Sequence, residues 1–505
     1  MLTRIRTATV EGVEGKPVEV ETDLHRGLPS LTVVGLADTT IRESCRRIRP
    51  AVINSGYRFP DGRVTVNLSP AGQPKEGSHF DLPIAIGIIT LGWNRSVPYN
   101  MAFMGELSLD GRINRIRGAL PLAMSLRKKG VKEIILPSGN AEEISILQDI
   151  RIFPADTLKE AVDHISGKKQ IDMYKGNPVK NNKKWDIDFS QVAGQETAKR
   201  AALIAAAGGH GIMMIGSPGC GKTMIAKRIP TILPELTYEE KLEITGIYSV
   251  AGLLDEECPI IGERPFRSPH HTSSAAAVIG GGRRPVPGEI SLAHRGVLFL
   301  DEFGEFSSRT IDAMRQPVEE GIIRLKRSMT EVTFPARVMM VLAANPCRCG
   351  NLWDEKKICT CSAKQIESYM RKISGPFSDR IDLHVKMSGI SANDIGYGGK
   401  NIRRTSSHEM RREVKAAMAI QRGRYAGTGI VSNSCLDEKG VDTFCVMNNI
   451  CRKMMKTAYE SMGLSVRAYY KVLKVARTIA DLENEEMIGE EHLAEALMYR
   501  QGTLR

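Results

Sequence analysis

The sequence predicts an α/β fold centred on a parallel sheet, with an α+β domain before it and a helical domain after it. Apolar runs without charged residues alternate with helical stretches in the central part of the chain. Such runs are typical of parallel strands covered on both faces. In the last hundred residues, apolar positions recur instead at three- and four-residue intervals, as on amphipathic helices. The three central runs lie at 212–215, 297–300 and 338–343.

The elements of the flanking domains follow from the same patterns. Residues 63–68 alternate apolar and polar side chains like a strand, and residues 82–91 form an apolar stretch typical of a buried helix. Residues 131–136 predict a further strand. Towards the carboxyl end, 409–421 and 466–482 have helical periodicity.

Changes in pattern divide the chain into four parts. A lysine-rich polar stretch with Asn and Gly separates the first domain from the core, and we expect it to be an exposed linker. The expected parts are the first domain at 1–166, the linker at 167–188, the core at 189–395 and a helical lid at 396–505.

Composition indicates an intracellular globular protein. The 505 residues are too many for one hydrophobic core, and lysine plus arginine exceed the acids by 12. That excess suits a polyanion such as nucleic acid, although a mildly basic protein without such a partner is the alternative. The sequence has no long uncharged apolar run and no apolar leader at its start, so we expect a cytoplasmic protein without a membrane partner.

One glycine-rich segment carries the pattern of a phosphate-binding loop. It follows the 212–215 run and precedes a predicted helix at 222–228. Glycines let successive N–H groups point at phosphates, and the helix amino end attracts the same anion. Lys222 would reach the β- and γ-phosphates, and Thr223 would ligate Mg²⁺. The segment consists of Gly216, Ser217, Pro218, Gly219, Cys220, Gly221, Lys222 and Thr223.

Polar residues end the other two apolar runs. Asp301 and Glu302 follow 297–300, and Asn345 follows 338–343. Because parallel strands end at one edge of a sheet, these side chains are expected beside the phosphates. Asp301 would hold Mg²⁺, Glu302 would polarise the attacking water and Asn345 would orient that water. A surface acid pair and a turn-forming Asn are the alternatives.

These residues and several longer strings resemble AAA+ ATPases of the magnesium-chelatase-like branch, and most closely the family of the competence protein ComM, also called YifB. The resemblance covers nearly the whole chain. It implies ATP and Mg²⁺ as cofactors and places Val192 and Gly194 in the adenine pocket. The strings that carry it lie at 189–195, 268–276, 287–296, 373–382 and 476–482.

Two arginines take roles from this resemblance. Arg380 resembles the arginine finger that reaches a neighbouring subunit's γ-phosphate, and Arg467 resembles the lid arginine that senses the nucleotide. A guanidinium suits both tasks because it stays charged. If Arg380 acts on a neighbour, the protein forms a ring, most often a hexamer. Surface salt bridges are the alternative for each arginine.

Two basic inserts resemble pore elements of the family and are candidates for DNA contacts. One, at 265–284, has a glycine-rich basic tip, and the other is a hairpin at 322–333. Solvated basic loops are the alternative for both inserts. A basic stretch at 403–425 is a further candidate, with a solvated lid surface as the alternative. The candidate DNA residues of the two inserts are Arg283, Arg284, Arg324, Lys326 and Arg327.

The first domain resembles the Lon-protease-like domain, whose proteolytic members use a Ser–Lys pair. Here His79 stands at the nucleophile position and Leu120 at the lysine position, while Ser78 is one place away. Without an activated nucleophile, we expect a binding platform.

Four cysteines cluster as two C-x-C pairs within the loop 347–361. Four thiolates suit tetrahedral Zn²⁺, although this spacing is tighter than the usual C-x₂-C and unligated or redox-active thiols remain an alternative. The four residues are Cys347, Cys349, Cys359 and Cys361.

Three functions fit these observations. The first is a hexameric ATP-driven motor on branched or single-stranded DNA, which the ComM resemblance connects with branch migration or helicase activity during integration of incoming DNA in natural transformation or recombination. The second is a chelatase-like ATPase that remodels a protein partner. The third, an ATP-dependent protease, is disfavoured by the residues at positions 79 and 120.

Overall fold

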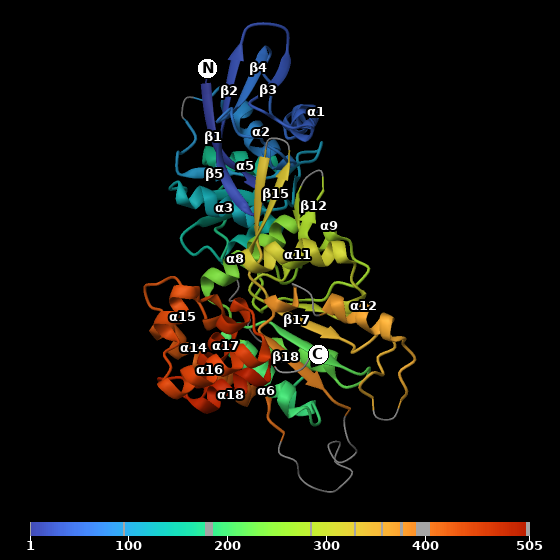
Figure 1. The fold of residues 1–505 in the computed structure, drawn as a ribbon. Helices are drawn as coiled ribbons and strands as arrows, with labels where there is room; N and C mark the ends of the chain where they lie inside the picture. Colours follow the sequence, from blue (N-terminus) through green and yellow to red (C-terminus); the bar gives the residue numbers. More distant parts are fainter. Residues whose placement is uncertain are drawn as a thin grey trace.

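The computed structural model has three parts that follow one another along the chain (Figure 1). An N-terminal domain lies at one end, the central domain occupies the middle, and a helical lid packs beside the central domain. The α/β prediction with a helical lid is confirmed. The structure describes residues 2–93, 96–176, 185–282, 285–327, 330–354, 357–373, 377–389 and 404–500.

The N-terminal domain is a seven-stranded mixed sheet in the order β3-β4-β2-β1-β5-β8-β9. Two apolar clusters lie on its two faces, one including side chains of α1, α2 and α5 and the other side chains of α3 and α4. The two predicted strands and the buried helix correspond to β4, β8 and α2. The strands are β1 (Leu2–Glu11), β2 (Glu14–His25), β3 (Ser30–Val34), β4 (Arg63–Ser69), β5 (Met101–Phe103), β8 (Glu133–Pro137) and β9 (Arg151–Ala155), with the small hairpin β6 (Glu106–Leu107) and β7 (Ile113–Asn114). The helices are α1 (Thr39–Asn54), α2 (Asp81–Thr90), α3 (Ala119–Lys128), α4 (Ser138–Ile144) and α5 (Leu158–Ser166).

The central domain has a five-stranded parallel sheet in the order β11-β14-β17-β10-β18. The three apolar runs form β14, β17 and β10, and their side chains are buried on both faces. The strands are β10 (Ile212–Gly216), β11 (Phe266–Arg267), β14 (Val297–Leu300), β17 (Met339–Ala344) and β18 (Leu383–Met387), with two hairpins, β12 (Gly280–Gly281) with β13 (Val286–Pro287) and β15 (Ile322–Arg327) with β16 (Thr330–Pro335). The helices are α6 (Glu196–Gly208), α7 (Lys222–Ile232), α8 (Tyr238–Ala251), α9 (Ala275–Ile279), α10 (Glu289–Leu292), α11 (Ser308–Glu320) and α12 (Ala363–Ile373).

The lid shares one continuous apolar core with α6, α7 and the central sheet. A buried polar network also joins its helices: Asp481 accepts hydrogen bonds from Arg424, Arg477 and Asn433. Thr478, in the same helix as Asp481, contacts His210 of the central domain at 2.7 Å. The string 476–482 therefore holds the lid on the core. The lid helices are α14 (Ser407–Arg424), α15 (Glu438–Phe444), α16 (Asn449–Met462), α17 (Val466–Leu482) and α18 (Glu490–Met498).

The N-terminal domain is attached to the central domain through α8. Leu242 packs into the apolar cluster beneath α3 and α4, and Tyr238 donates a hydrogen bond to the Ile146 carbonyl at 3.1 Å. The Ser249 hydroxyl donates to the Glu143 carboxylate, whose pKa is raised because the group is buried. Buried polar pairs of this kind fix the relative placement of two elements, so α8 connects the two domains firmly.

A second contact joins the two domains at the β15–β16 hairpin, which points towards the N-terminal domain in Figure 1. Gly12, in the turn between β1 and β2, lies against Val332, and a Cβ at this glycine would stand 2.9 Å from the Val332 Cγ1. Val13 packs onto the apolar cluster of the hairpin. The first part of the predicted exposed linker is also packed, because Ile171 and Tyr174 contact the N-terminal core. Ile171 and Tyr174 are therefore half-buried, whereas the other described residues of 167–176 are exposed as expected, and 177–184 lies outside the described residues.

Candidate functional site

The phosphate-binding loop lies where β10 leaves the carboxyl edge of the central sheet and α7 begins. Gly219 and Gly221 have φ of 82° and 98°, a backbone conformation that favours glycine. The Lys222 Nζ donates hydrogen bonds to the Ser217 carbonyl and to the Asn345 Oδ1, both at 3.1 Å. Burial lowers the pKa of Lys222. The predicted lysine and the predicted Asn therefore meet at one point.

The residues predicted to hold magnesium are also in direct contact. The Thr223 hydroxyl donates to the Asp301 Oδ2 at 2.8 Å, across the gap between α7 and the end of β14. A hydroxyl and a carboxylate oxygen are hard ligands of the kind that Mg²⁺ prefers. This pair therefore fits the predicted Mg²⁺ that would accompany ATP.

Glu302 follows Asp301 in the left-handed region, with φ of 50°. Its carboxylate lies 3.2 Å from the Nδ1 of His271. His271 comes from the segment after β11, and because β11 pairs in parallel with β14, both segments leave the sheet at the same edge. The predicted catalytic residues do not include His271. This contact places the His271 imidazole beside the predicted catalytic acid.

The segment expected to line the adenine pocket lies beside the phosphate-binding loop. Val192 is buried in the core and Gly194 has φ of 59°. Between this segment and the loop, the Gln195 side chain donates to the carbonyls of Cys220 at 3.1 Å and Ser388 at 2.6 Å. Val192 and Gly194 are thus adjacent to the loop, and their contact with adenine remains a prediction.

Arg380 lies at the opposite edge of the sheet. β18 begins at Leu383, which pairs with Ile212 at the start of β10, so Arg380 precedes the amino edge. The phosphate-binding loop follows the other end of the same strand. The five residues of β10 separate the two edges by roughly 16 Å, at about 3.3 Å per residue. Within one chain, Arg380 and Lys222 therefore belong to different surfaces.

Arg467 lies with Arg380, and the two arginines share one carboxylate. The Arg380 Nη2 is 2.9 Å from the Glu319 Oε2, and the Arg467 guanidinium pairs with the other oxygen of Glu319. Although burial raises the pKa of Asp382, the Lys471 ammonium beside it holds that pKa well below the usual range. Arg380, Arg467 and Lys471 line a cavity of about 880 Å³ between the lid and the amino edge of the sheet.

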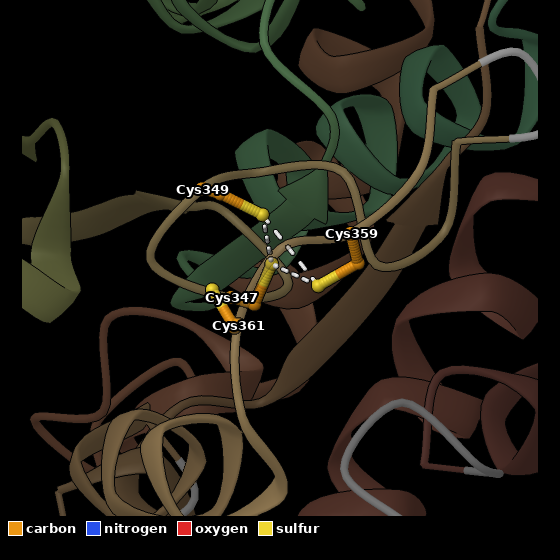
Figure 2. A group of neighbouring side chains, drawn as sticks. All are labelled: Cys347, Cys349, Cys359 and Cys361. Atoms are coloured by element: carbon orange, nitrogen blue, oxygen red, sulfur yellow. Dashed lines mark hydrogen bonds between the residues drawn. The ribbon is translucent and has the colours of Figure 1, made fainter.

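The four clustered cysteines come together, as Figure 2 shows. Their sulfur atoms all lie within 4.8 Å of one another. Cys347 is buried, whereas the other three are partly exposed. Backbone N–H groups, first that of Asn351, lower the pKa of Cys349 to about 5. All ten cysteines of the chain are free thiols.

The predicted hairpin is confirmed, but only part of the basic set can be described. Arg324 and Lys326 are exposed on β15, and Arg324 pairs with Glu320 at 2.6 Å. Arg283, Arg284 and the Arg327 side chain lie outside the described residues.

In the lid, two arginines of the basic stretch have contacts within the protein, whereas Arg404, Arg412 and Arg422 are exposed and their contact with DNA remains a prediction. Arg411 donates to the Thr231 carbonyl at 2.8 Å, and Arg424 pairs with buried Asp481. Tyr425 is buried as well. Arg411 therefore joins the lid to α7 of the central domain, and Arg424 joins α14 to α17 within the lid.

The positions that would carry proteolysis have internal contacts. His79 is buried and its Nε2 lies 2.8 Å from the Ala8 carbonyl. Leu120 is buried in the apolar cluster of α3. Ser78 donates to the Glu106 carboxylate, and a carboxylate–serine contact without a lysine is not the pair that this protease class uses.

The fold and the paired lysine, threonine and acid residues define a P-loop ATPase of the AAA+ class. Family models for the magnesium chelatase subunit ChlI match all three parts of the chain, at residues 20–140, 188–395 and, for its C-terminal region, 404–500.

Full-length relatives narrow the class. The chain is 39% identical over 507 residues to "Uncharacterized protein YifB" of Escherichia coli K12, covering 99% of this chain and 97% of that protein. It is also 39% identical over 497 residues to "Competence protein ComM" of Haemophilus influenzae, covering 97% and 95%. The chain therefore belongs to the ComM/YifB family of magnesium-chelatase-like AAA+ ATPases.

A partial similarity concerns the N-terminal domain alone. A mitochondrial Lon protease homologue of Ostreococcus lucimarinus is 35% identical over 92 residues, which is 18% of this chain and 10% of that protein. Among the described residues, no helix is long and apolar enough to cross a lipid bilayer.

Proposed function

We propose that the protein is a ring-forming, ATP-driven DNA motor with branch-migration or helicase activity. The observation that carries this proposal is the division of the nucleotide site between two edges of one sheet. Lys222 lies at one edge and Arg380 at the other. A second copy of the chain that places its Arg380 edge on the Lys222 edge would complete the site, and repetition of this head-to-tail contact generates a ring. A hexamer is the expected closure.

In the assembled site, each residue would have a separate task. Lys222 would bind the β- and γ-phosphates, while Thr223 and Asp301 would hold Mg²⁺. Glu302 would polarise water for attack on the γ-phosphorus, and Asn345 would orient that water. Arg380 of the neighbour would stabilise the negative charge that spreads over the phosphoryl oxygens.

DNA is proposed as the substrate on three grounds. The chain carries a net charge of +12. The β15–β16 hairpin presents exposed Arg324 and Lys326. The name of the Haemophilus relative connects that protein with competence, the state in which cells take up DNA. We therefore propose branched or single-stranded DNA as the partner and integration of incoming DNA as the process.

The test is ATPase activity at low salt with forked DNA, single-stranded DNA or no DNA, together with negative-stain imaging in the presence of ATP. The proposal expects rings and a several-fold stimulation by DNA. The double substitution Arg324→Ala with Lys326→Ala should reduce stimulation, because phosphate contacts depend on cationic side chains. Exposed Lys439 on α15 gives a matched control. The motor proposal is refuted if DNA does not stimulate ATP hydrolysis and the protein does not retain DNA at low salt.

A chelatase-like protein-remodelling ATPase is the second candidate, favoured by the matches to the ChlI family models. It predicts that the ATP-bound chain captures a large protein partner from its host, and that this partner, rather than DNA, stimulates turnover. Proteolysis receives no support from the contacts of His79, Leu120 and Ser78.

We also propose Zn²⁺ as the ion of the cysteine loop. Four sulfur ligands select Zn²⁺ over the hard ions that suit Thr223 and Asp301. Zinc analysis of the purified chain, with one ion per chain expected, tests this assignment.

A further inference from the structure

We infer that the Zn²⁺ site of the cysteine loop controls ATP binding by holding that loop against the phosphate-binding loop. The inference rests on the proposed zinc site and deepens the proposed ATPase function. It makes the ion a structural regulator of the nucleotide site in its own subunit, distinct from the Mg²⁺ that accompanies ATP.

The sulfur geometry fits a tetrahedral ion. Cys347 Sγ lies 3.3 Å from Cys349 Sγ and 3.7 Å from Cys359 Sγ, and the latter two are 3.5 Å apart (Figure 2). With Zn–S bonds of about 2.3 Å, a tetrahedral site separates its sulfurs by about 3.8 Å. Cys361 completes the group within 4.8 Å. All four sulfurs can therefore reach one ion with small shifts.

The first half of the loop lies directly on the phosphate-binding loop. Cys347 is two residues beyond Asn345, whose side chain accepts from Lys222. Gly350 packs on Pro218: a Cβ at this glycine would stand 2.6 Å from the Pro218 Cδ. Gly350 also has φ of 82°, so both space and backbone favour glycine here. The loop thus covers Pro218 and continues from the residue that contacts Lys222.

The second half of the loop is fixed to the other side of the site. Cys361 leads into α12, where Tyr369 is buried against Gly304. A Cβ at Gly304 would lie 2.4 Å from the Tyr369 ring. Gly304 is two residues beyond Glu302. The loop therefore joins the end of β17 at Asn345 to a helix packed behind Glu302.

An ion in this loop would connect its two halves. Cys347 and Cys349 belong to the half beside Pro218, and Cys359 and Cys361 to the half that leads into α12. Cross-linking two ends of a loop removes conformations that would otherwise have to be lost when the loop is ordered. Without the ion, Gly350 can leave Pro218, and the phosphate-binding loop loses a restraint on the conformation that receives ATP.

The experiment measures zinc content and ATP affinity separately on the purified full-length chain, without DNA. Zinc is measured by elemental analysis, and affinity by titration with a fluorescent ATP analogue and Mg²⁺. Wild type is expected to hold one zinc per chain. The double substitution Cys359→Ser with Cys361→Ser should lose zinc and weaken ATP binding by about tenfold, a size common for coupling between two sites. Cys258→Ser with Cys435→Ser, two exposed cysteines elsewhere, is the matched control and should match wild type.

Gly350→Ala separates the ion from its effect. The added Cβ should push the loop away from Pro218 while the four thiolates remain. Full zinc with ATP affinity reduced by about tenfold would support the coupling, and this variant keeps the test open if the cysteine variants do not fold. Wild-type ATP affinity in folded zinc-free protein, or in zinc-loaded Gly350→Ala, would overturn the inference while the ATPase proposal stands. Wild type that holds no zinc, even after refolding with it, would overturn the metal site itself.

Discussion

The two edges of the central sheet differ in how complete their chemistry is. At the carboxyl edge, Lys222 contacts Asn345 and Thr223 contacts Asp301, so the groups predicted to bind phosphate and metal already meet. At the amino edge, Arg380 and Arg467 line a cavity and share the carboxylate of Glu319, while Lys471 beside them pairs with Asp382. One edge has the parts to bind ATP, and the other has cations of the kind that stabilise its transition state. This difference supports the proposal that two neighbouring chains each contribute one half of a shared site.

The largest effect is expected at the amino edge. Arg380→Ala should leave ATP binding nearly unchanged but reduce kcat by about 10³, the lower range for removal of an arginine finger. Turnover and nucleotide titration of the same preparation check this. Arg371→Ala removes an exposed arginine that pairs only within its own helix and should have little effect. Equal turnover in the two variants would contradict the role of Arg380.

At the carboxyl edge, Glu302→Gln should reduce kcat by about 10², since an amide cannot take up the proton of the attacking water. ATP affinity should be retained. The measurement is single-turnover hydrolysis with ATP in place before Mg²⁺ is added. If kcat falls less than about threefold, the general base lies elsewhere.

His271→Ala should reduce kcat by about fivefold, because the imidazole lies 3.2 Å from the Glu302 carboxylate and helps to orient it. His270 stacks beside His271 but contacts Thr272, so His270→Ala is the matched control. The role of His271 fails if both variants show the same turnover, or if His271→Ala lowers kcat further in a Glu302→Gln background as much as alone.

A smaller and opposite effect is expected for Glu319→Gln. This carboxylate pairs with Arg380 and Arg467, and in the proposed ring it would compete with a neighbour's phosphate for both arginines. Removal of its charge should lower the protein concentration needed for half-maximal turnover by about twofold, which is the size expected for a partly exposed ion pair. Glu320→Gln changes the adjacent acid, which pairs with Arg324, and should leave that concentration unchanged. A higher concentration requirement for Glu319→Gln would show that the acid orders the arginines rather than competing for them.

In the N-terminal domain, the prediction concerns the pH dependence of stability and not ATP turnover. Burial lowers the pKa of His79 from 6.5 to about 4, partly offset by its contact with Ala8. The folded domain therefore disfavours protonated His79. The contribution of the neutral imidazole to the free energy of unfolding is fully present above pH 6.5. About 3 kcal/mol of it is lost as the pH falls towards 4. Urea unfolding at pH 7 and at pH 4.5 should show a smaller loss for His79→Gln than for wild type. Equal losses would contradict the buried neutral imidazole.

The sequence predicted the carboxyl edge well and the amino edge only through resemblance. β10, β14 and β17 are continuous apolar runs followed by Gly216, Asp301 and Asn345, so the strands and their polar ends were visible together. β18 was not predicted because His384 and Lys386 interrupt its apolar pattern, and β11 is too short to show one.

The contacts that depend on strand register and on the packing of distant segments could not be predicted from the sequence. The contact of His271 with Glu302 depends on the pairing of β11 with β14. The contact of Glu319 with Arg467 arises because α11 ends beside the first turn of α17. His271 lies in the 268–276 string, but the string alone gives it no role, and Glu319, an acid at the end of a helix, is an ordinary surface residue in sequence. The packing of Gly350 on Pro218 likewise joins positions 132 residues apart in the chain.

A mixing experiment tests the shared site most directly. Lys222→Ala cannot bind phosphate at its own carboxyl edge but keeps Arg380, whereas Arg380→Ala keeps its own binding edge and offers its neighbour no arginine. Each variant alone should hydrolyse ATP poorly. When equal amounts are mixed as dissociated chains and assembled with ATP and Mg²⁺, about one contact in four should pair an intact Lys222 edge with an intact Arg380 edge. The account predicts recovery of a corresponding part of wild-type turnover. A mixture that co-assembles and stays as inactive as its components would contradict a site shared between neighbouring chains.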